Sequence, residues 1–568
     1  MTSCTEEIPD LPRTNQKPKT FLWLYPDSTV GTGVSRQHLR WWGEDPDGRV
    51  IGYLFAFASF TNEVKTVPSP DTLAYTYVTT NDTLLAFPLD TLFRKYTVFV
   101  RGVDNSFRGL PHRSAVRLGT GPYWDKNRNG VFDGNDEPLD DLLNAIDPTG
   151  AVQTFPIRNT PPTIVFAQSP NDPSLALKQP DTTYPVATFG WKASDADGDN
   201  TLASYRVALN DTSDPTAWLT IPVRDTVVTL VVPRRRSDSA STIVAADVYG
   251  GKFLGRQLLG TVRGMRLDAL NQLYLQARDV AGEYSRAITM PSGANHWYVK
   301  KPSASLLLVN DYILTGFDNP VPTYVTTLMN IPGGRFSTVD FLDIGRGLTN
   351  NDKSLGKPGA LVPQYVDPAL IYTFLLYEYV LWYTDRFPSL GVAQLSLFTY
   401  LQNGGKVVFS TTFLNSTDPR GALKDFAPID SVSSENLLSP PIPSRGSNII
   451  PASYRVIPNT SVPSNIYPQL ALNEQPAIHS IFMRPVYRRS DARYIYHLQA
   501  DTASTPARYI GMPNVGVVDG QGRIIFIGLP LHLLNNTVQG NPFGLTAFFT
   551  KVFTEGFNTS QSIDRSRF

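Results

Sequence analysis

Cysteine is nearly absent from this chain of 568 residues, which contains Cys4 alone. A single cysteine excludes an intrachain disulfide, so stability has to come from buried apolar cores and from bound ions. Long apolar runs are also missing, because no segment reaches the roughly 18 residues that a membrane-spanning helix needs. The chain lacks net charge as well, since 50 basic residues balance 50 acidic ones. Without a basic field, we expect no nucleic acid among its partners.

The residues that are abundant point to β-structure outside the cytoplasm. Only 18% of residues are charged, whereas aromatic residues reach 11% and prolines number 46. Few charges together with many Tyr, Phe, Thr and Pro residues favour β-rich extracytoplasmic modules over a cytosolic helical enzyme. The length corresponds to about three domains, each long enough to bury a core.

One sequence pattern occurs twice. Each copy has a tryptophan, an Asp-x-Asp-Gly turn, a tyrosine on an alternating strand and a later strand that ends in an aspartate: Trp41, Asp45, Asp47, Gly48, Tyr53 and Asp104, then Trp191, Asp195, Asp197, Gly198, Tyr205 and Asp279. We expect each tryptophan to fill a core and each Asp-Gly turn to tighten a hairpin, because Asp and Gly tolerate turn dihedrals. The matching offsets indicate a duplicated module.

Short alternating segments divided by turn residues predict antiparallel sandwiches around both copies. In the first copy these segments are 21–25, 39–42, 50–57, 72–78 and 96–101. With their Trp, Asp-x-Asp-Gly and Tyr residues, both copies resemble fibronectin type III-like (immunoglobulin-like) modules. We expect a flexible tether at 1–19, a first sandwich at 20–160 with an insertion at 119–150, and a second sandwich at 161–302. This resemblance concerns the fold and is nearly silent on function.

The alternation stops after Pro302. A continuous apolar run at 305–309 is typical of a buried parallel strand, and further strands are expected at 336–343, 377–383, 406–410 and 523–528. Helices are expected at 392–401 and 545–553. The overall prediction is therefore a multidomain β plus α/β chain, in which a doubly wound α/β domain at 303–556 precedes a tail at 557–568. A Ser-, Pro- and Asn-rich stretch at 414–470 is interpreted as a long loop insertion.

This last domain resembles the class I glutamine amidotransferase-like fold, a relative of the flavodoxin-like fold. The resemblance lies in the segments 382–385 and 400–409 and in Ile-Gly-Leu-Pro-Leu-His532, and it implies a Cys-His-Glu hydrolase. The chain departs from the family at the nucleophile, because its only cysteine lies in the tether and 408–413 contains no Gly-x-Cys-x-Gly or Gly-x-Ser-x-Gly elbow. His532 is followed by two leucines and not by Pro-Glu, so its orienting partner is also missing.

Three residues form the candidate ligand site of this domain. Asp311 and Asp385 follow predicted strands, as Asp343 does, and doubly wound sheets bind ligands at the carboxyl ends of their strands. With His532, such carboxylates would bind a cation or act in acid–base chemistry. The alternative is that the aspartates cap helices or terminate strands and that His532 is a satisfied core residue.

The twelve residues from Asp125 to Asp136 fit an EF-hand or dockerin-type calcium loop. Calcium takes six to eight oxygens, supplied here by side chains at positions 1, 3, 5, 9 and 12 and by the backbone carbonyl at position 7. These positions are Asp125, Asn127, Asn129, Asp133, Asp136 and Val131, with Gly130 at the sharp turn. We expect calcium to brace this insertion, and the alternative is an ordinary Asn/Asp/Gly turn. The two Asp-x-Asp-Gly turns are weaker calcium candidates, since turn chemistry alone explains them.

Met1-Thr-Ser-Cys4 resembles the end of a bacterial lipoprotein signal, and a polar, Pro-containing tether follows it. We expect that a longer signal precedes Cys4 in the cell and that Cys4 is the mature residue carrying the lipid. The alternative is a free thiol in a flexible N-terminus.

The favoured function is therefore a non-catalytic cell-envelope lipoprotein, in the outer membrane or at the cell surface, that uses a calcium-stabilised stalk to present a degenerate α/β domain to a protein partner. The first alternative is a surface hydrolase with a non-standard site built from Asp311, Asp385 and His532. A second alternative is a carbohydrate-binding surface protein, suggested by the many Tyr and Trp residues, although aromatic residues mostly fill β cores.

Overall fold

The computed structural model describes most of the chain, and the chain divides into two compact units. Unit 1 comprises Met1–Ile164, Ala193–Tyr205 and Gln276–Arg286, and unit 2 comprises the remainder. The module boundaries expected at 160/161 and 302/303 stay predictions. The described residues are 14–24, 35–60, 69–88, 94–119, 121–157, 159–166, 182–251, 257–293, 295–312, 320–344, 368–384, 388–413, 421–433, 455–463, 465–471, 484–500, 502, 511–534, 544–557 and 563.

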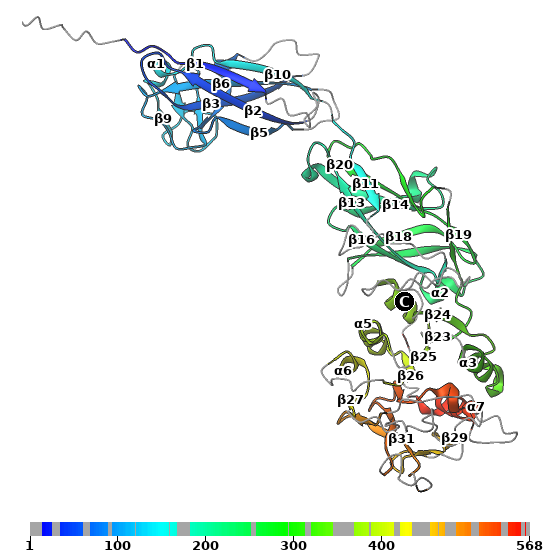
Figure 1. Cartoon of the computed structure of the whole chain (residues 1–568). Coiled ribbons are helices and arrows are strands. Elements are labelled where there is room, and N and C mark those ends of the chain that lie inside the picture. Colours follow the sequence, from blue (N-terminus) through cyan, green and yellow to red (C-terminus); the bar gives the residue numbers. More distant parts are fainter. Residues whose placement is uncertain are drawn as a thin grey trace, which may run out of the picture. The chain divides into compact units, whose positions relative to one another are not determined.

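Two antiparallel sheets form the first sandwich (Figure 1). The smaller sheet has the order β1-β2-β5, with bounds Lys19–Leu24, Arg36–Glu44 and Asp82–Ala86. The larger sheet has the order β10-β6-β3-β4-β7-β8-β9, with bounds Ala151–Ile157, Arg94–Asp104, Val50–Phe60, Ala74–Val78, Ser114–Arg117, Tyr123–Trp124 and Glu137–Pro138. The 3₁₀ turn η1 (Pro70–Thr72) precedes β4, and the short helix α1 (Leu142–Ala145) follows β9.

The repeated tryptophan fills the core of the first sandwich, as the sequence predicts. Along β2 the side chains alternate, so that Trp41 is buried whereas its neighbour Trp42 is exposed. The Trp41 ring lies 5.4 Å from that of Phe55 and 6.2 Å from that of Tyr53. Its indole N–H donates to the carbonyl oxygen of Thr80 at 3.1 Å, so the polar edge of the buried ring is also satisfied.

The second module contains three sheets. Their orders are β11-β13-β16-β17-β18, β15-β14-β20-β21 and β12-β22-β19. In the first of these sheets the bounds, in order, are Thr163–Phe166, Val186–Ser194, Val227–Val231, Ile243–Gly250 and Gln257–Arg266. In the second they are Leu219–Pro222, Leu202–Leu209, Leu273–Asp279 and Ile288–Met290. In the third they are Thr182–Thr183, Trp297–Val299 and Ala269–Asn271. The short helices η2 (Asp199–Thr201), η3 (Pro215–Ala217) and α2 (Arg234–Ser237) join its strands. Trp191 and Tyr205 are buried like their counterparts in the first copy.

The C-terminal part is built on one mixed sheet of nine strands, with the order β24-β23-β25-β26-β33-β32-β31-β28-β29. The five strands from β24 to β33 are parallel, and the remaining pairs are antiparallel. In sheet order their bounds are Asp340–Asp343, Leu306–Asp311, Tyr379–Thr384, Lys406–Ser410, Ile524–Ile527, Asn514–Val518, Arg493–Leu498, Arg455–Pro458 and Leu470–Ala471. A separate pair joins β27 (Ile429–Val432) to β30 (Val486–Arg488).

Helices cover both faces of the parallel part (Figure 1). α3 (Pro320–Met329) and α7 (Leu545–Lys551) contribute to one hydrophobic cluster, whereas α4 (Pro368–Leu375), α5 (Leu390–Gln402) and α6 (Leu423–Phe426) contribute to the other. α7 continues into a π-helical turn at Val552–Gly556, and the 3₁₀ turns η4 (Pro332–Gly334) and η6 (Leu531–Leu534) complete this part. Successive residues of β23 enter opposite clusters, which explains its continuous apolar sequence.

Two sequence expectations differ from the structure. The strand expected at 336–343 begins only at Asp340, because Phe336 packs against Tyr379 and Phe553 as part of a core cluster. The stretch 414–470 was expected to be a loop, but it contains α6, β27 and β28, and β28 joins the antiparallel edge of the large sheet. Within this stretch, 414–420, 434–454 and 464 lie outside the described residues.

Among the described residues, no helix is long and apolar enough to cross a membrane.

Candidate functional site

The predicted calcium loop is closed at its base by a two-residue β-ladder. β8 pairs with β9, which joins Tyr123 to Pro138 and Trp124 to Glu137, so the segment from Asp125 to Asp136 starts and ends at neighbouring points. Gly130 has φ of 78°, a left-handed conformation that glycine adopts without strain, at the sixth position of the loop.

Within the loop, each short polar side chain accepts a backbone N–H. Asp125 Oδ2 accepts from Gly130 at 3.0 Å, Asn127 Oδ1 from Asn129 at 3.1 Å, Asn129 Oδ1 from Val131 at 2.8 Å, and Asp136 accepts from Lys126 at 3.0 Å and from Asp133 at 2.9 Å. The amide groups of Asn127 and Asn129 both donate to Asp133 Oδ2. Hydrogen bonds from Asn135 and Asn127 lower the pKa of Asp133. The polar side chains of the loop therefore bond to one another and to its own backbone, although Asn127 and Asn129 are exposed.

Asp125 carries the polar atom of this loop that is best placed to bind an ion. Its side chain is buried, its Oδ2 also contacts Arg117 Nε at 3.3 Å, and its Oδ1 is buried without a hydrogen-bond partner. A buried carboxylate oxygen without a donor is costly unless a cation is bound there. No three His, Cys, Asp or Glu side chains of the described chain are gathered tightly enough to hold a metal by themselves. The donor set of this loop fits calcium through its mixture of carboxylate, amide and carbonyl oxygens.

The carboxylate of Asp311, at the end of β23, is completely buried. Its Oδ1 accepts the hydroxyl of Ser389 at 2.6 Å, and its Oδ2 accepts the backbone N–H of Ser389 at 2.8 Å and the indole N–H of Trp382 at 3.2 Å. Ser389 immediately precedes α5, so Asp311 fastens the start of this helix to the strand ends. The carboxylate thus serves in holding the fold together.

His532 lies in η6 and is 5% exposed. Its ring packs edge-on against Tyr312 at 5.7 Å and Tyr324 at 5.9 Å, and its backbone N–H donates to the hydroxyl of Tyr324 at 3.2 Å. Because Tyr312 follows Asp311 directly, the structure brings two of the three candidate residues to one region. The third, Asp385, lies outside the described residues, as does Cys4.

Ser410 occupies the end of β26, inside 408–413, where the amidotransferase resemblance requires a nucleophile elbow. It is fully buried, its hydroxyl donates to the carbonyl oxygen of Leu529 at 2.8 Å, and it accepts the N–H of Leu531 at 3.1 Å. Sequence reasoning missed both Ser410 and Tyr324. The run Lys406–Ser410 identified the strand, but nothing in it indicated that the serine would tie the turn before His532.

The two Asp-x-Asp-Gly turns make equivalent contacts with the segment that enters each sandwich. In the first copy, Gln16 N–H donates to Asp47 in the turn at 3.0 Å, and Asn15 Nδ2 donates to Asp104 Oδ2 at the end of β6 at 3.1 Å. In the second copy, Thr160 N–H donates to Asp197 Oδ2 in the turn at 2.8 Å, and Asn159 Nδ2 donates to Asp279 Oδ2 at the end of β20 at 2.7 Å. All of these residues belong to unit 1. A signal for the contact is in the sequence: Asn-x-x-Pro occurs at 15–18 and again at 159–162.

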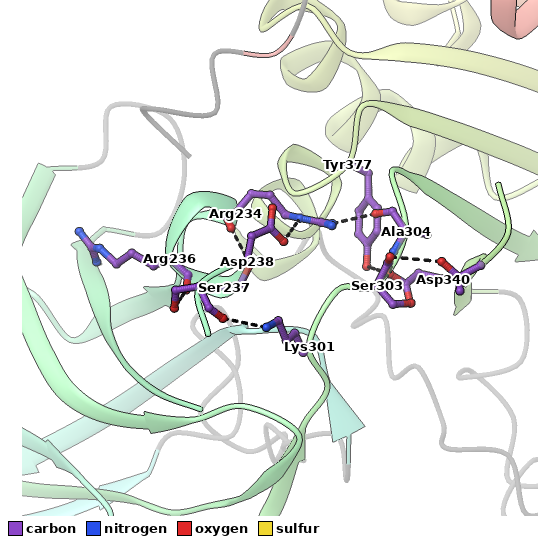
Figure 2. A network of polar contacts seen from close by, with 11 residues as sticks. Arg234, Arg236, Ser237, Asp238, Lys301, Ser303, Ala304, Asp340 and Tyr377 are labelled. Carbon is purple, nitrogen blue, oxygen red and sulfur yellow. Dashed lines mark hydrogen bonds and ion pairs between the residues drawn. The ribbon is translucent and has the colours of Figure 1, made fainter. Parts of the chain in front are cut away.

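Unit 2 contains a polar network centred on Asp340, shown in Figure 2. The buried Asp340 carboxylate accepts from Ser303 N–H at 2.6 Å, Ser303 Oγ at 2.9 Å, Ala304 N–H at 3.0 Å and Tyr377 Oη at 3.2 Å, and Lys300 Nζ lies 3.2 Å away. These donors stand between β22 and β23 and before β25. One carboxylate therefore holds together the segment that leads into the large sheet.

Arg234 of α2 joins the same network. Its Nη1 donates to the carbonyl oxygen of Ala304 at 2.8 Å, and its Nε donates to Asp238 at 2.8 Å. Tyr184 exchanges hydrogen bonds with the backbone of Phe341 and packs edge-on against Tyr377 at 5.5 Å. Burial raises the pKa of Tyr184 and of Tyr377, and the nearby Asp340 carboxylate adds to both shifts, so both hydroxyls are neutral donors at physiological pH.

Comparisons with known proteins give little at the level of sequence. No family model matches the chain, and no curated protein matches it. Solved structures that align with it include the fibronectin(III)-like modules of Clostridium thermocellum CbhA (10% identity, 49% of this chain and 94% of that chain, TM-score 0.14), the central fibronectin-III array of RIM-binding protein (12%, 50% and 70%, 0.12) and the FN1–FN3 domains of chicken CNTN1 (7%, 48% and 98%, 0.12). At these TM-scores the tandem sandwich architecture rests on the strand pairings described above.

Replacing Asp340 with Asn should destabilise unit 2. The substitution removes the buried negative charge of Asp340, which Lys300 and four further donors contact. We therefore expect the free energy of unfolding of this region to fall by about 3 kcal/mol. Hydrogen exchange of the β23 and β24 amides measures it. The matched control is Glu555→Gln, which removes an exposed ion pair with Lys551 and should change stability by about 0.5 kcal/mol or less. Equal effects of the two substitutions would contradict the role of Asp340.

Proposed function

We propose that this protein is a non-catalytic lipoprotein of the cell envelope, in the outer membrane or at the cell surface. Its two sandwiches form a stalk, the first of them braced by calcium, and its C-terminal domain is a degenerate relative of the class I glutamine amidotransferase-like fold that binds a protein partner. Nucleic acid is not among the proposed partners.

The single observation that carries this proposal is that polar groups at the carboxyl ends of the parallel strands are buried and hydrogen-bonded to other parts of the domain. The Asp311 carboxylate holds Ser389 and Trp382, and the Ser410 hydroxyl holds the turn before His532. A catalytic acid, base or nucleophile needs an atom within reach of the substrate. Groups that are buried and engaged in holding the fold favour a binding domain over the hydrolase alternative.

The order of the parallel strands supports the proposed relationship of the C-terminal domain. Numbered along the chain, β23, β24, β25, β26 and β33 lie in the sheet as 2-1-3-4-5, which is the flavodoxin-like arrangement of a doubly wound fold. Ligands of such folds bind where the strand order reverses, between the first and third strands. Asp311 ends the first strand, so it stands at this point with its carboxylate bonded to Trp382 and Ser389.

The calcium proposal rests on the loop from Asp125 to Asp136. Asp125, Asn127, Asn129, Asp133 and Asp136 would hold the ion with their side-chain oxygens, and Val131 with its carbonyl oxygen. The ion would supply the partner that Asp125 Oδ1 lacks, while Arg117 stays paired with Oδ2, and would keep the loop closed over β8 and β9.

Calcium titration of the full chain tests the loop. We expect Asp125→Ala to lower the number of bound calcium ions by one and to remove the associated stabilisation, which is about 2.7 kcal/mol at a calcium concentration of 100 times Kd. Isothermal titration calorimetry and thermal unfolding measure both effects. The control is Asp140→Ala, which removes an exposed carboxylate just beyond the loop and should leave binding intact. Unchanged stoichiometry in Asp125→Ala would refute the loop as a calcium site.

The membrane anchor is proposed at Cys4, followed by the polar tether. When the gene is expressed with its native upstream sequence in its own cells, the mature protein should begin at Cys4 with a lipid on the thiol and the amine and should sediment with membranes. Mass spectrometry of the N-terminal peptide identifies the modification. In the Cys4→Ser variant, lipid and membrane association should both be lost. An unmodified Cys4 in membrane-extracted protein would rule out the anchor.

The partner surface is proposed on α5, which exposes two large apolar side chains one turn apart. Leu395 is 46% exposed and Phe398 is 43% exposed. A photoreactive amino acid at Phe398 should form a discrete adduct with an envelope protein in intact cells. The same probe at Glu555, on the exposed end of the π-helical turn, should not. Equal labelling from both positions, or none from either, would count against α5 as the partner surface.

A further inference from the structure

Asp195 lies in the second Asp-x-Asp-Gly turn, and the hydrogen bonds of the turn account for only one of its two carboxylate oxygens. Its Oδ1 accepts the N–H of Asp197 at 2.8 Å, as expected in an Asx turn. Its Oδ2 is buried and accepts no hydrogen bond, and the residue is only 8% exposed. A buried charged oxygen without a donor requires a bound cation or a proton.

Two further buried carboxylates, those of Asp197 and Asp279, lie near enough to Asp195 to add to the rise that burial causes in its pKa. Asp197 and Asp279 are each 1% exposed. Asp197 accepts from Ser35 N–H at 2.7 Å and Thr160 N–H at 2.8 Å, and Asp279 accepts from Glu283 N–H at 2.9 Å and Asn159 Nδ2 at 2.7 Å. Within the described part of the chain, none of the three aspartates forms an ion pair with a lysine, arginine or histidine. The partners of these carboxylates are therefore neutral groups: N–H donors and, at Asp195, the Thr201 side chain, whose hydrogen bond lowers the pKa against the larger effect of burial.

Asn159 supplies a second oxygen of the same kind. Its Nδ2 donates to Asp279, while its Oδ1 is buried and has no hydrogen-bond partner. This oxygen is neutral, so it is an observation independent of the acidic residues. Asn159 and Asp195 thus each keep a buried oxygen without a donor, and Asn159 is bonded to Asp279.

The pattern recurs in the first copy. Asp45 Oδ2 is buried without a partner, like Asp195 Oδ2, and Asn15 donates to Asp104 as Asn159 does to Asp279. Burial raises the pKa of both Asp45 and Asp195, and the nearby carboxylates of each cluster contribute to the increase. Both copies thus keep one buried carboxylate oxygen without a donor in the Asp-x-Asp-Gly turn, although Asp47 is exposed where Asp197 is buried.

We propose that a calcium ion binds between Asp195, Asp279 and Asn159, at the point where the chain enters the second sandwich. Carboxylate and amide oxygens are hard ligands that calcium accepts in flexible geometry, and water completes its coordination. No three acidic side chains of the described residues converge as a metal centre, so the amide oxygen of Asn159 is an essential ligand. The ion would fix the entering segment, since Asn159 and Thr160 already bond to the same cluster.

The test uses the full chain with Asp125→Ala, which disables the separate loop proposed above. This background should still bind calcium in calorimetric titration, and adding Asp195→Asn should remove one equivalent. Asn at this position keeps the Oδ1 acceptor for Asp197 but places an N–H group where Oδ2 stood. Asp199→Asn is the matched control, because Asp199 is an exposed carboxylate of the same turn that accepts Asp195 N–H at 3.2 Å. It should leave the stoichiometry unchanged.

Two outcomes would overturn the proposal. One is equal calcium stoichiometry with and without Asp195→Asn. The other is that the Asp125→Ala chain binds no calcium and becomes more stable as the pH falls, and that adding Asp195→Asn abolishes this increase in stability. A carboxyl whose folded-state pKa is raised gains stability when it is protonated, so this result would assign a proton to Oδ2. The two calcium proposals can be refuted independently. If Asp125→Ala removes all calcium binding, the site at Asp195 is refuted and the loop is retained. If Asp125→Ala leaves calcium binding unchanged, the loop is refuted and the site at Asp195 is retained.

Discussion

The burial of carboxylates is the constraint on which the rest of this structure depends. A charge removed from water has to be matched by donors or by a cation, because its desolvation otherwise outweighs what the fold gains. Asp340 meets this condition with backbone and side-chain donors and with Lys300, and it joins the chain after the second sandwich to the large sheet. Asp311 meets it with Ser389 and Trp382 and so fixes α5.

Where the donors are incomplete, the same constraint points to ions. Asp125, Asp195 and Asp45 each keep one buried oxygen without a partner, and each stands in a turn rich in Asp, Asn and Gly. A chain with one cysteine has no disulfides within its sandwiches, so calcium at these turns is a chemically reasonable brace.

In the C-terminal domain the buried carboxylate and hydroxyl at the strand ends have protein donors and acceptors. At the carboxyl ends of its parallel strands, Asp311 and Ser410 are completely buried and hydrogen-bonded, and His532 packs between Tyr312 and Tyr324. Aromatic rings and satisfied polar groups occupy the region where flavodoxin-like folds place ligands. The exposed apolar side chains of α5, Leu395 and Phe398, are the basis of the proposed partner surface.

The sequence by itself determined the periodic features: the duplicated core tryptophans, the buried strand that starts at Leu306, helix α5 with its Asn-Gly-Gly end, and the twelve-residue loop from Asp125. These are predictable because burial and turn dihedrals follow from neighbours along the chain. Only the tertiary structure decided that Asn159 meets Asp279, that Ser410 ties the turn before His532, and that Asp340 gathers donors from 300–304 and 377. Such contacts join residues tens to more than a hundred positions apart, so even the repeated Asn-x-x-Pro segment does not by itself identify the carboxylate that its asparagine meets.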